Sequence, residues 1–136
     1  MRALRILATD EAVDLIIQLS MQYGLLMFHM NELGEPECTI DGRTKLSSRD
    51  TCIGEVAGCL FFMNKRKYES SKHTQLILDV EKGKENGLSL ERALGLRFLV
   101  RSRLFTAEEL EELEGMDEGP EMRMFSYIFG YGLQWV

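Results

Sequence analysis

A helix-like repeat of apolar residues lies between two short apolar segments near the N-terminus, and this arrangement constrains the fold more than any other feature. Thr9, followed by two acidic residues, is typical of a helix start, and Gly24 is a natural helix end. Between them apolar residues recur at three- and four-residue spacing, which predicts an amphipathic helix that ends near Gln22. Residues 2–8 before this helix and residues 25–29 after it are predicted strands.

Glycines divide the next part of the chain into short segments. Between residues 38 and 63, Asp41-Gly42 and two later glycines predict turns in an antiparallel meander, because Asp-Gly is a strong hairpin signal. Asn64 is a suitable cap for a short helix over residues 65–69. Alternating apolar residues then predict a strand over residues 74–80.

The last part of the body is predicted to hold two further strands and one helix. The strands are expected near residues 88–90 and 96–103. Thr106 and Glu109 form a capping box, which predicts an acidic helix that runs to Glu114 and stops at Gly115. We therefore expect an α+β fold, a compact and mostly antiparallel β domain with one principal N-terminal helix and one or two short helices.

The length of 136 residues fits one domain with one hydrophobic core. We place this domain at residues 1–114. Residues 115–136 are expected to be a linker and an aromatic C-terminal extension that docks on its own domain or on a second subunit.

Charge and cysteine content exclude several classes of protein. Residues 108–136 carry a net charge of −7 and residues 1–107 one of +1, so neither half offers the concentrated basic patch that nucleic acid requires. Three cysteines without a repeating spacing argue against a disulfide framework and for a cytoplasmic location. No segment is long enough to span a bilayer, so we expect no membrane partner.

The loop between His29 and Cys38 is a candidate metal site. Histidine and cysteine are ligands of divalent metals, and Glu32, Glu35 and Glu37 lie in the same loop. The spacing matches no zinc pattern, however, and a histidine at a strand end beside a lone cysteine is commonly structural. We expect no resident cofactor, with a divalent metal at His29 and Cys38 as the alternative.

Four residues form a candidate anion site late in the chain. Lys72 and His73 precede a predicted strand, while Arg101 and Arg103 share one face of another because their spacing is two. The alternative is a solvated strand face whose cations pair with carboxylates. No phosphate loop, nucleophile elbow or dinucleotide fingerprint is present in the sequence, which disfavours the common cofactor enzymes.

The C-terminal extension is unusually aromatic. Leaving its rings exposed in a monomer would be costly, since burial of apolar surface is worth about 25 cal/mol per Å². We expect a homodimer contact or docking on the same chain through Phe125, Tyr127, Phe129, Tyr131 and Trp135.

Several segments resemble a bacterial family known only as domain of unknown function 779. They are Met27-Phe28-His29, Gly54-Glu55, Lys72 to Val80, Leu88 to Glu91 and Arg97 to Thr106. Members of that family are often encoded beside aldehyde dehydrogenases, which implies such an enzyme as a partner. The family has a glycine- and cysteine-rich loop that ends in proline, any residue, cysteine; Pro36-Glu37-Cys38 matches the ending, but the paired cysteines before it are missing.

A more distant resemblance is to the A-type iron–sulfur carrier, or HesB-like, fold. It implies a compact antiparallel β domain, but the cysteine ligands of the carriers are absent here, so the resemblance does not imply a cluster. We therefore expect a non-catalytic accessory or interaction protein. A metal-binding protein and a small enzyme acting on an anionic substrate are the alternatives.

Overall fold

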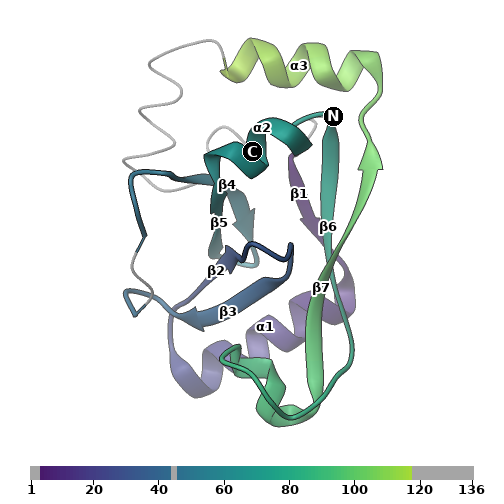
Figure 1. Ribbon diagram of the computed structural model, residues 1–136. Helices are drawn as coiled ribbons and strands as arrows, with labels where there is room; N and C mark the ends of the chain where they lie inside the picture. Colours follow the sequence, from purple (N-terminus) through teal and green to yellow (C-terminus); the bar gives the residue numbers. More distant parts are fainter. Residues whose placement is uncertain (1–3, 44–45, 118–136) are drawn as a thin grey trace.

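The computed structural model describes residues 4–43 and 46–117, and it arranges them as two β-sheets with helices around them (Figure 1). One sheet has the strand order β1-β6-β7 and the other the order β3-β2-β5-β4. The strands are β1 (Ile6–Ala8), β2 (Leu26–Met30), β3 (Pro36–Ile40), β4 (Asp50–Val56), β5 (Cys59–Asn64), β6 (Thr74–Lys82) and β7 (Leu96–Leu104). The helices are α1 (Asp10–Tyr23), α2 (Lys65–Ser71), α3 (Ala107–Asp117) and the 3-10 helix η1 (Leu90–Leu94).

Most strand pairs are antiparallel, which confirms the predicted α+β class. The antiparallel pairs are β2–β3, β4–β5 and β6–β7, while β1–β6 and β2–β5 are parallel. The two sheets also contact each other at their edges, with β1 near β4 and β3 near β7. The strands therefore enclose one core, and α1 lies along the lower end of it in Figure 1.

Helix α1 has the ends that its sequence predicts. The Thr9 side chain accepts a hydrogen bond from the Ala12 N–H at 3.2 Å, and Thr9 Oγ1 donates to Asp79 on β6. Gly24 follows the helix with a φ of 87°, and its N–H donates to the Ser20 carbonyl. The apolar face of α1 is buried in the core, through Ala12, Leu15, Ile16 and Leu19.

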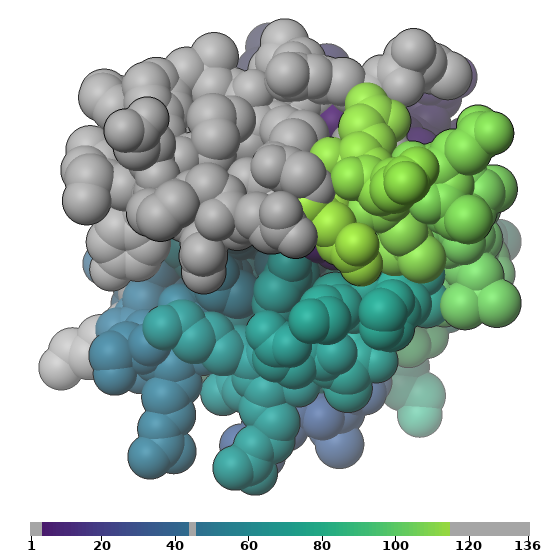
Figure 2. All heavy atoms as spheres, turned by 90° about the horizontal axis from the view of Figure 1, so that it is seen from above, coloured from purple at the N-terminus to yellow at the C-terminus, as the bar shows by residue number. Residues whose placement is uncertain are grey.

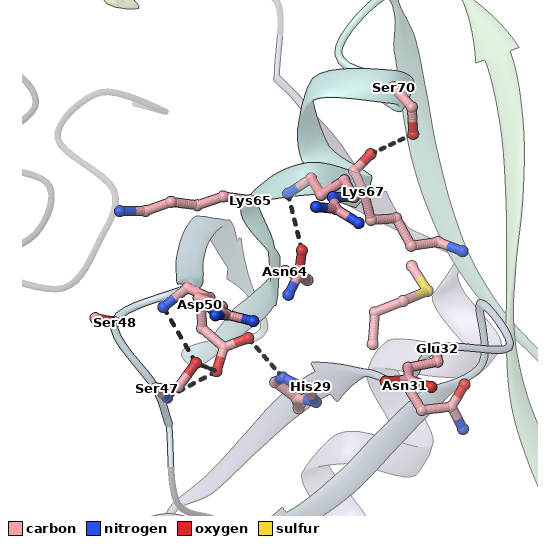
Figure 3. A pocket seen from close by; sticks show the side chains of 13 residues that line it. His29, Asn31, Glu32, Ser47, Ser48, Asp50, Asn64, Lys65, Lys67 and Ser70 are labelled. Carbon is pink, nitrogen blue, oxygen red and sulfur yellow. Dashed lines mark hydrogen bonds and ion pairs between the residues drawn. The ribbon is translucent and has the colours of Figure 1, made fainter.

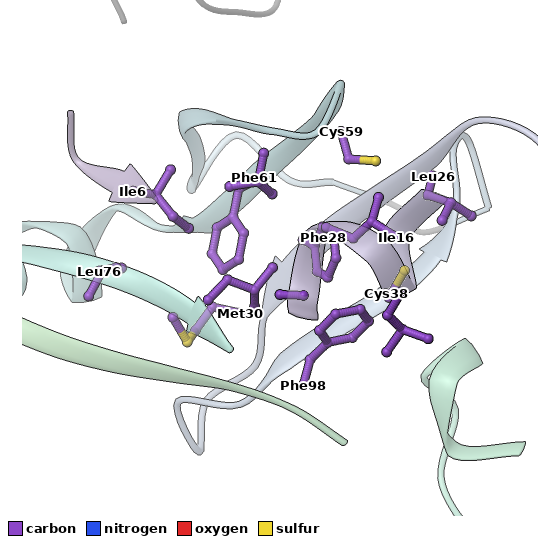
Figure 4. Packing of buried hydrophobic residues seen from close by; sticks show 14 of the residues in the cluster. Ile6, Ile16, Leu26, Phe28, Met30, Cys38, Cys59, Phe61, Leu76 and Phe98 are labelled. Atoms are coloured by element: carbon purple, nitrogen blue, oxygen red, sulfur yellow. The ribbon is translucent and has the colours of Figure 1, made fainter. Parts of the chain in front are cut away.

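Three phenylalanines from both sheets form the centre of the core (Figure 4). The Phe28 ring on β2 stacks on Phe61 of β5 with centroids 5.7 Å apart, and it meets Phe98 of β7 edge-on at 5.1 Å. All three side chains are fully buried. Because burying one such side chain stabilises the fold by about 1.5–3 kcal/mol, this contact contributes strongly to holding the two sheets together.

The meander predicted between residues 38 and 63 is wrong at Asp41-Gly42, whereas the turn expected at Gly58 is present. Asp41-Gly42 does not join two paired strands, because β3 and β4 lie at opposite edges of their sheet. The hairpin turn is Ala57-Gly58 between β4 and β5, where φ is 49° and 82°. Two successive positive φ values are typical of the type I′ turn, whose twist matches that of the strands it connects.

The strand predicted near residues 88–90 is also wrong, because the chain forms η1 from Leu90 onwards. Leu88 is exposed, and Ser89 is buried and hydrogen-bonded to the backbone N–H of Cys38. The alternation of leucine and serine thus reflects a buried polar contact and not a pleated strand.

Helix α3 begins with the predicted capping box and continues past its predicted end. The Glu109 N–H donates to Thr106 Oγ1, and the Thr106 N–H donates to Glu109 Oε1. The helix does not stop at Glu114 but runs through Gly115 to Asp117, because glycine weakens a helix without being forced to end it. From above, α3 and the end of β7 lie together at one corner of the surface (Figure 2).

Candidate functional site

A pocket of about 1080 Å³ lies where β2 ends, β4 begins and β5 leads into α2 (Figure 3). His29 is on the side of β2 that faces away from the core, because its neighbours Phe28 and Met30 are core residues. The described residues that line the pocket are His29, Met30, Asn31, Glu32, Ser47, Ser48, Arg49, Asp50, Asn64, Lys65, Arg66, Lys67 and Ser70.

His29 and Asp50 form a hydrogen-bonded pair at the wall of this pocket. His29 Nε2 lies 2.9 Å from Asp50 Oδ1, and Asp50 Oδ2 accepts a hydrogen bond from the Ser47 N–H at 2.9 Å. Burial alone would raise the pKa of Asp50, but the hydrogen bonds from Ser47 and His29 outweigh burial and lower it. Since an ionised carboxylate only accepts hydrogen bonds, Nε2 of His29 is the donor in this pair, and Nδ1 is an acceptor when the imidazole is neutral.

Four cationic side chains from two parts of the chain line the same pocket. Arg49 precedes β4, while Lys65, Arg66 and Lys67 form the first turn of α2. A backbone hydrogen bond of 2.7 Å from Lys65 N–H to the Arg49 carbonyl joins the two parts. With Glu32 and Asp50 as the carboxylates of the described lining, the pocket has a surplus of positive charge.

Lys67 is directed toward the loop between β2 and β3. A Cβ atom at Gly34 would lie 3.0 Å from Lys67 Nζ, so the glycine leaves room for the ammonium group. Gly34 also has a φ of 82°, which favours glycine. Figure 3 shows Lys65 and Lys67 extending in opposite directions, so the cations are spread along the pocket.

The pairing register separates the two residues of the expected metal site. His29 is opposite Glu37, and Cys38 is opposite Phe28, so the His29 and Cys38 side chains lie on opposite faces of the sheet. Burial, followed by the charge of Glu91, raises the pKa of the Cys38 thiol, which disfavours the thiolate that a metal would bind. Within residues 4–43 and 46–114, no three His, Cys, Asp or Glu side chains are grouped as metal ligands would be.

Cys38 instead belongs to a buried polar network under the edge of the core. Its N–H donates to Ser89 Oγ at 2.7 Å, and Ser89 Oγ donates to the fully buried Glu91. Glu91 also accepts a hydrogen bond from the Phe98 N–H at 2.9 Å. The network thus connects β3, η1 and β7.

The four residues of the expected anion site lie near the β6–β7 pair, but ion pairs engage three of them. Arg101 contacts Asp79 at 3.0 Å, Arg103 contacts Glu109 at 2.7 Å, and Lys72 contacts Glu69 at 3.0 Å. His73 is exposed just before β6, and its carbonyl accepts a hydrogen bond from the Phe105 N–H. These cation–carboxylate pairs are the ones expected for the alternative interpretation, a solvated strand face.

The aromatic residues Phe125, Tyr127, Phe129, Tyr131 and Trp135 lie outside the described residues, so the dimer contact stays a prediction. None of the helices within the described ranges has the length and apolar character needed to cross a membrane.

Sequence reasoning missed most of this pocket. Asp50 belongs to no recognisable motif in the sequence. The Lys65-Arg66-Lys67 run did not indicate a site, because a charged run on a short helix usually faces water. The one available signal was the Ser47-Ser48 pair shortly before Asp50. Serine and aspartate side chains in turns often form hydrogen bonds with nearby backbone groups, as Asp50 does with the Ser47 N–H.

Comparison with known protein families matches residues 15–104 to a family model described as Domain of unknown function (DUF779). The match covers most of the strands above, including β2, β4 and β5 with the His29–Asp50 pair. No curated protein shows significant similarity to the chain.

Proposed function

The chain belongs to the DUF779 family, whose description names no activity, and we propose from the geometry that it binds a small anionic ligand in the His29 pocket. The main observation behind this proposal is that, within the described residues, the cations of β7 form ion pairs with carboxylates and the cations of the pocket do not. On β7, Arg97, Arg101 and Arg103 each contact a carboxylate. In the part of the chain that the structure describes, no ion pair joins the four pocket cations to a carboxylate.

The electrostatics of the pocket support this proposal. Asp50 is the more buried of the two carboxylates, and it is engaged by His29 and Ser47. Its charge is therefore partly compensated within the protein, while the positive charges of Arg49, Arg66 and their neighbours face the pocket. An anion would complete this arrangement through charge-assisted hydrogen bonds, which are stronger than neutral ones.

Isothermal titration calorimetry with inorganic phosphate tests the proposal. The double variant Arg49→Gln/Arg66→Gln should lower the affinity by about a hundredfold, because it removes two hydrogen bonds from charged groups that contribute about 1.5 kcal/mol each. Lys82→Gln/Lys84→Gln is the matched control, since both lysines are exposed and lie outside the pocket. Equal affinity for the two variants, or no phosphate binding by the wild type, would contradict the proposal.

We further propose that the role of the protein is that of a non-catalytic accessory or interaction protein, with an aldehyde dehydrogenase as the candidate partner. The resemblance that suggests this partner concerns the family, and the aromatic composition of residues 122–136 is of the kind that protein contacts bury. Affinity purification of the full chain from its host tests the partner. Recovery of the protein alone, as a monomer, would argue against this partner and against a homodimer contact.

A second candidate function is acid–base catalysis on an anionic substrate. The hydrogen bond between His29 and Asp50 favours it, because a carboxylate that orients an imidazole is a common way to prepare a general base. Hydrolysis of p-nitrophenyl phosphate by the wild type, and its loss in His29→Gln with phosphate binding retained, would support catalysis. Absence of turnover together with phosphate binding favours the binding role.

A further inference from the structure

The uncharged polar side chains of the pocket indicate which class of anion it binds; this inference rests on the proposed anion-binding function. Besides its charges, the described lining contains Ser48, Asn64 and Ser70, all of them exposed. Asn64 Oδ1 accepts the Arg66 N–H, which leaves the amide NH2 as a donor, and Ser70 Oγ donates to the Lys67 carbonyl, which leaves its oxygen as an acceptor. No hydrogen bond within the described residues uses the Ser48 hydroxyl.

The charge of the pocket fits a phosphate monoester. Four cations face two carboxylates in the described lining, so a surplus of two positive charges remains when His29 is neutral. A phosphate monoester carries about −1.5 to −2 charges near pH 7, whereas a monocarboxylate carries only one. Arginine and lysine together are also the side chains that phosphate groups recruit.

The size and lining of the pocket indicate what is attached to the phosphate. A volume of about 1080 Å³ exceeds what a single phosphate ion fills and suits a whole small molecule. None of the described lining residues is Phe, Tyr or Trp, and Met30 is the one purely apolar side chain among them. Proteins commonly hold a nucleobase by stacking it on an aromatic ring, so this lining disfavours a nucleotide.

We propose that the ligand of the His29 pocket is a phosphorylated polyhydroxy compound of the sugar phosphate class. The phosphate lies at Arg49 and Arg66, whose segments are joined by the Lys65 N–H to Arg49 carbonyl hydrogen bond, and the hydroxyl groups contact Ser48, Ser70 and the amide of Asn64. His29 Nδ1 accepts one further hydrogen bond from a ligand hydroxyl, because Nε2 is held by Asp50.

The experiment is a calorimetric comparison of four probes with the full chain: glucose 6-phosphate, inorganic phosphate, glucose and adenosine monophosphate. Glucose 6-phosphate should bind about fivefold or more tighter than phosphate, since two or three added hydrogen bonds of ordinary strength suffice for that ratio. Glucose alone should not bind measurably, and adenosine monophosphate should bind no tighter than phosphate. Equal binding of phosphate and glucose 6-phosphate, or tightest binding of adenosine monophosphate, would overturn the ligand class while leaving anion binding intact.

A variant pair assigns the hydroxyl contacts. Ser48→Ala/Ser70→Ala should lower the affinity for glucose 6-phosphate toward that for phosphate, without changing the affinity for phosphate, while the contacts of Asn64 and His29 remain. Ser102→Ala on β7 is the control, because it removes an exposed hydroxyl far along the chain from the pocket. If both affinities fall together, or neither falls, the hydroxyl contacts are wrong.

The same chemistry occurs on a phosphoinositide headgroup, and a sedimentation experiment separates the two sources. We expect no binding to phosphatidylcholine vesicles that contain phosphatidylinositol 4-phosphate, because a soluble sugar phosphate is the ligand. Binding to these vesicles without binding to glucose 6-phosphate would overturn the proposal. Failure of every probe, phosphate included, would instead refute the underlying anion-binding function.

Discussion

Replacement of Glu91 by alanine should lower the free energy of unfolding by about 3 kcal/mol. Glu91 is fully buried and accepts hydrogen bonds from the Phe98 N–H and from Ser89 Oγ. Alanine leaves both donors without their acceptor, and each buried donor that loses its partner costs about 1–3 kcal/mol. A loss of this size is a large part of the about 5–15 kcal/mol by which proteins are typically stable.

Ser89→Ala should have an effect of similar size, about 3 kcal/mol, because the Cys38 N–H loses its acceptor and the buried Glu91 loses one of its donors. Urea unfolding followed by circular dichroism measures both values by linear extrapolation. Glu85→Ala is the control, since Glu85 is exposed and its replacement should change stability by about 0.5 kcal/mol or less. A loss below about 1 kcal/mol for Glu91→Ala would show that this network does not connect β3 to β7 as argued.

Three further predictions concern other parts of the molecule. Asp50→Asn should lower the free energy of unfolding by about 1 kcal/mol, measured by urea unfolding, because it weakens the hydrogen bonds with His29 and Ser47. The same variant should raise the affinity for phosphate by about twofold, measured by calorimetry, because it removes a nearby negative charge. The hydrogen bond from Arg103 lowers the pKa of Glu109 to about 2. The ionised Glu109 should therefore stabilise the fold above the ordinary glutamate pKa of 4.5, and this stabilisation should be lost as the pH falls toward about 2. In thermal unfolding, Arg103→Gln should lack this pH-dependent stabilisation. Gly58→Ala should destabilise the β4–β5 hairpin by about 1 kcal/mol in urea unfolding, since Gly58 has a φ of 82°, and an unchanged midpoint would contradict the turn assignment.

Local signals predicted the parts of the fold that short-range chemistry determines. Thr9 and Gly24 define the ends of α1, and Thr106 with Glu109 defines the start of α3, because caps act within one helical turn. Asn64 likewise caps α2 through the Arg66 N–H. Each of these signals involves residues at most four positions apart.

Long-range pairing determined what the sequence could not predict. The parallel pairing of β2 with β5 displaces β4 to the far edge of the sheet, and it brings Asp50 to His29 although they are 21 residues apart. The register of β2 against β3 places Cys38 in the core, opposite Phe28. Neither relation leaves a periodic trace in the sequence, so the sequence paired His29 with Cys38, whereas the structure places it beside Asp50.

The burial of Glu91 is another feature that the sequence could not predict. Charged residues are almost never fully buried without partners, and the partners of Glu91 are Ser89 at the start of η1, the Phe98 N–H of β7 and Arg92, whose Nε lies 3.7 Å from Glu91 Oε2. A short Leu-Ser-Leu-Glu segment reads as a strand end in isolation. Only the assembled sheets show that its glutamate is part of the interior.

The most direct test of the central claim is backbone amide NMR of the full chain during titration with inorganic phosphate. The account predicts saturable shifts concentrated at Ser47–Asp50 and Asn64–Lys67, with His29 among the affected residues. Shifts concentrated instead at Arg97, Arg101 and Arg103 on β7, or the absence of saturable shifts, would contradict the assignment of an anion site to the His29 pocket.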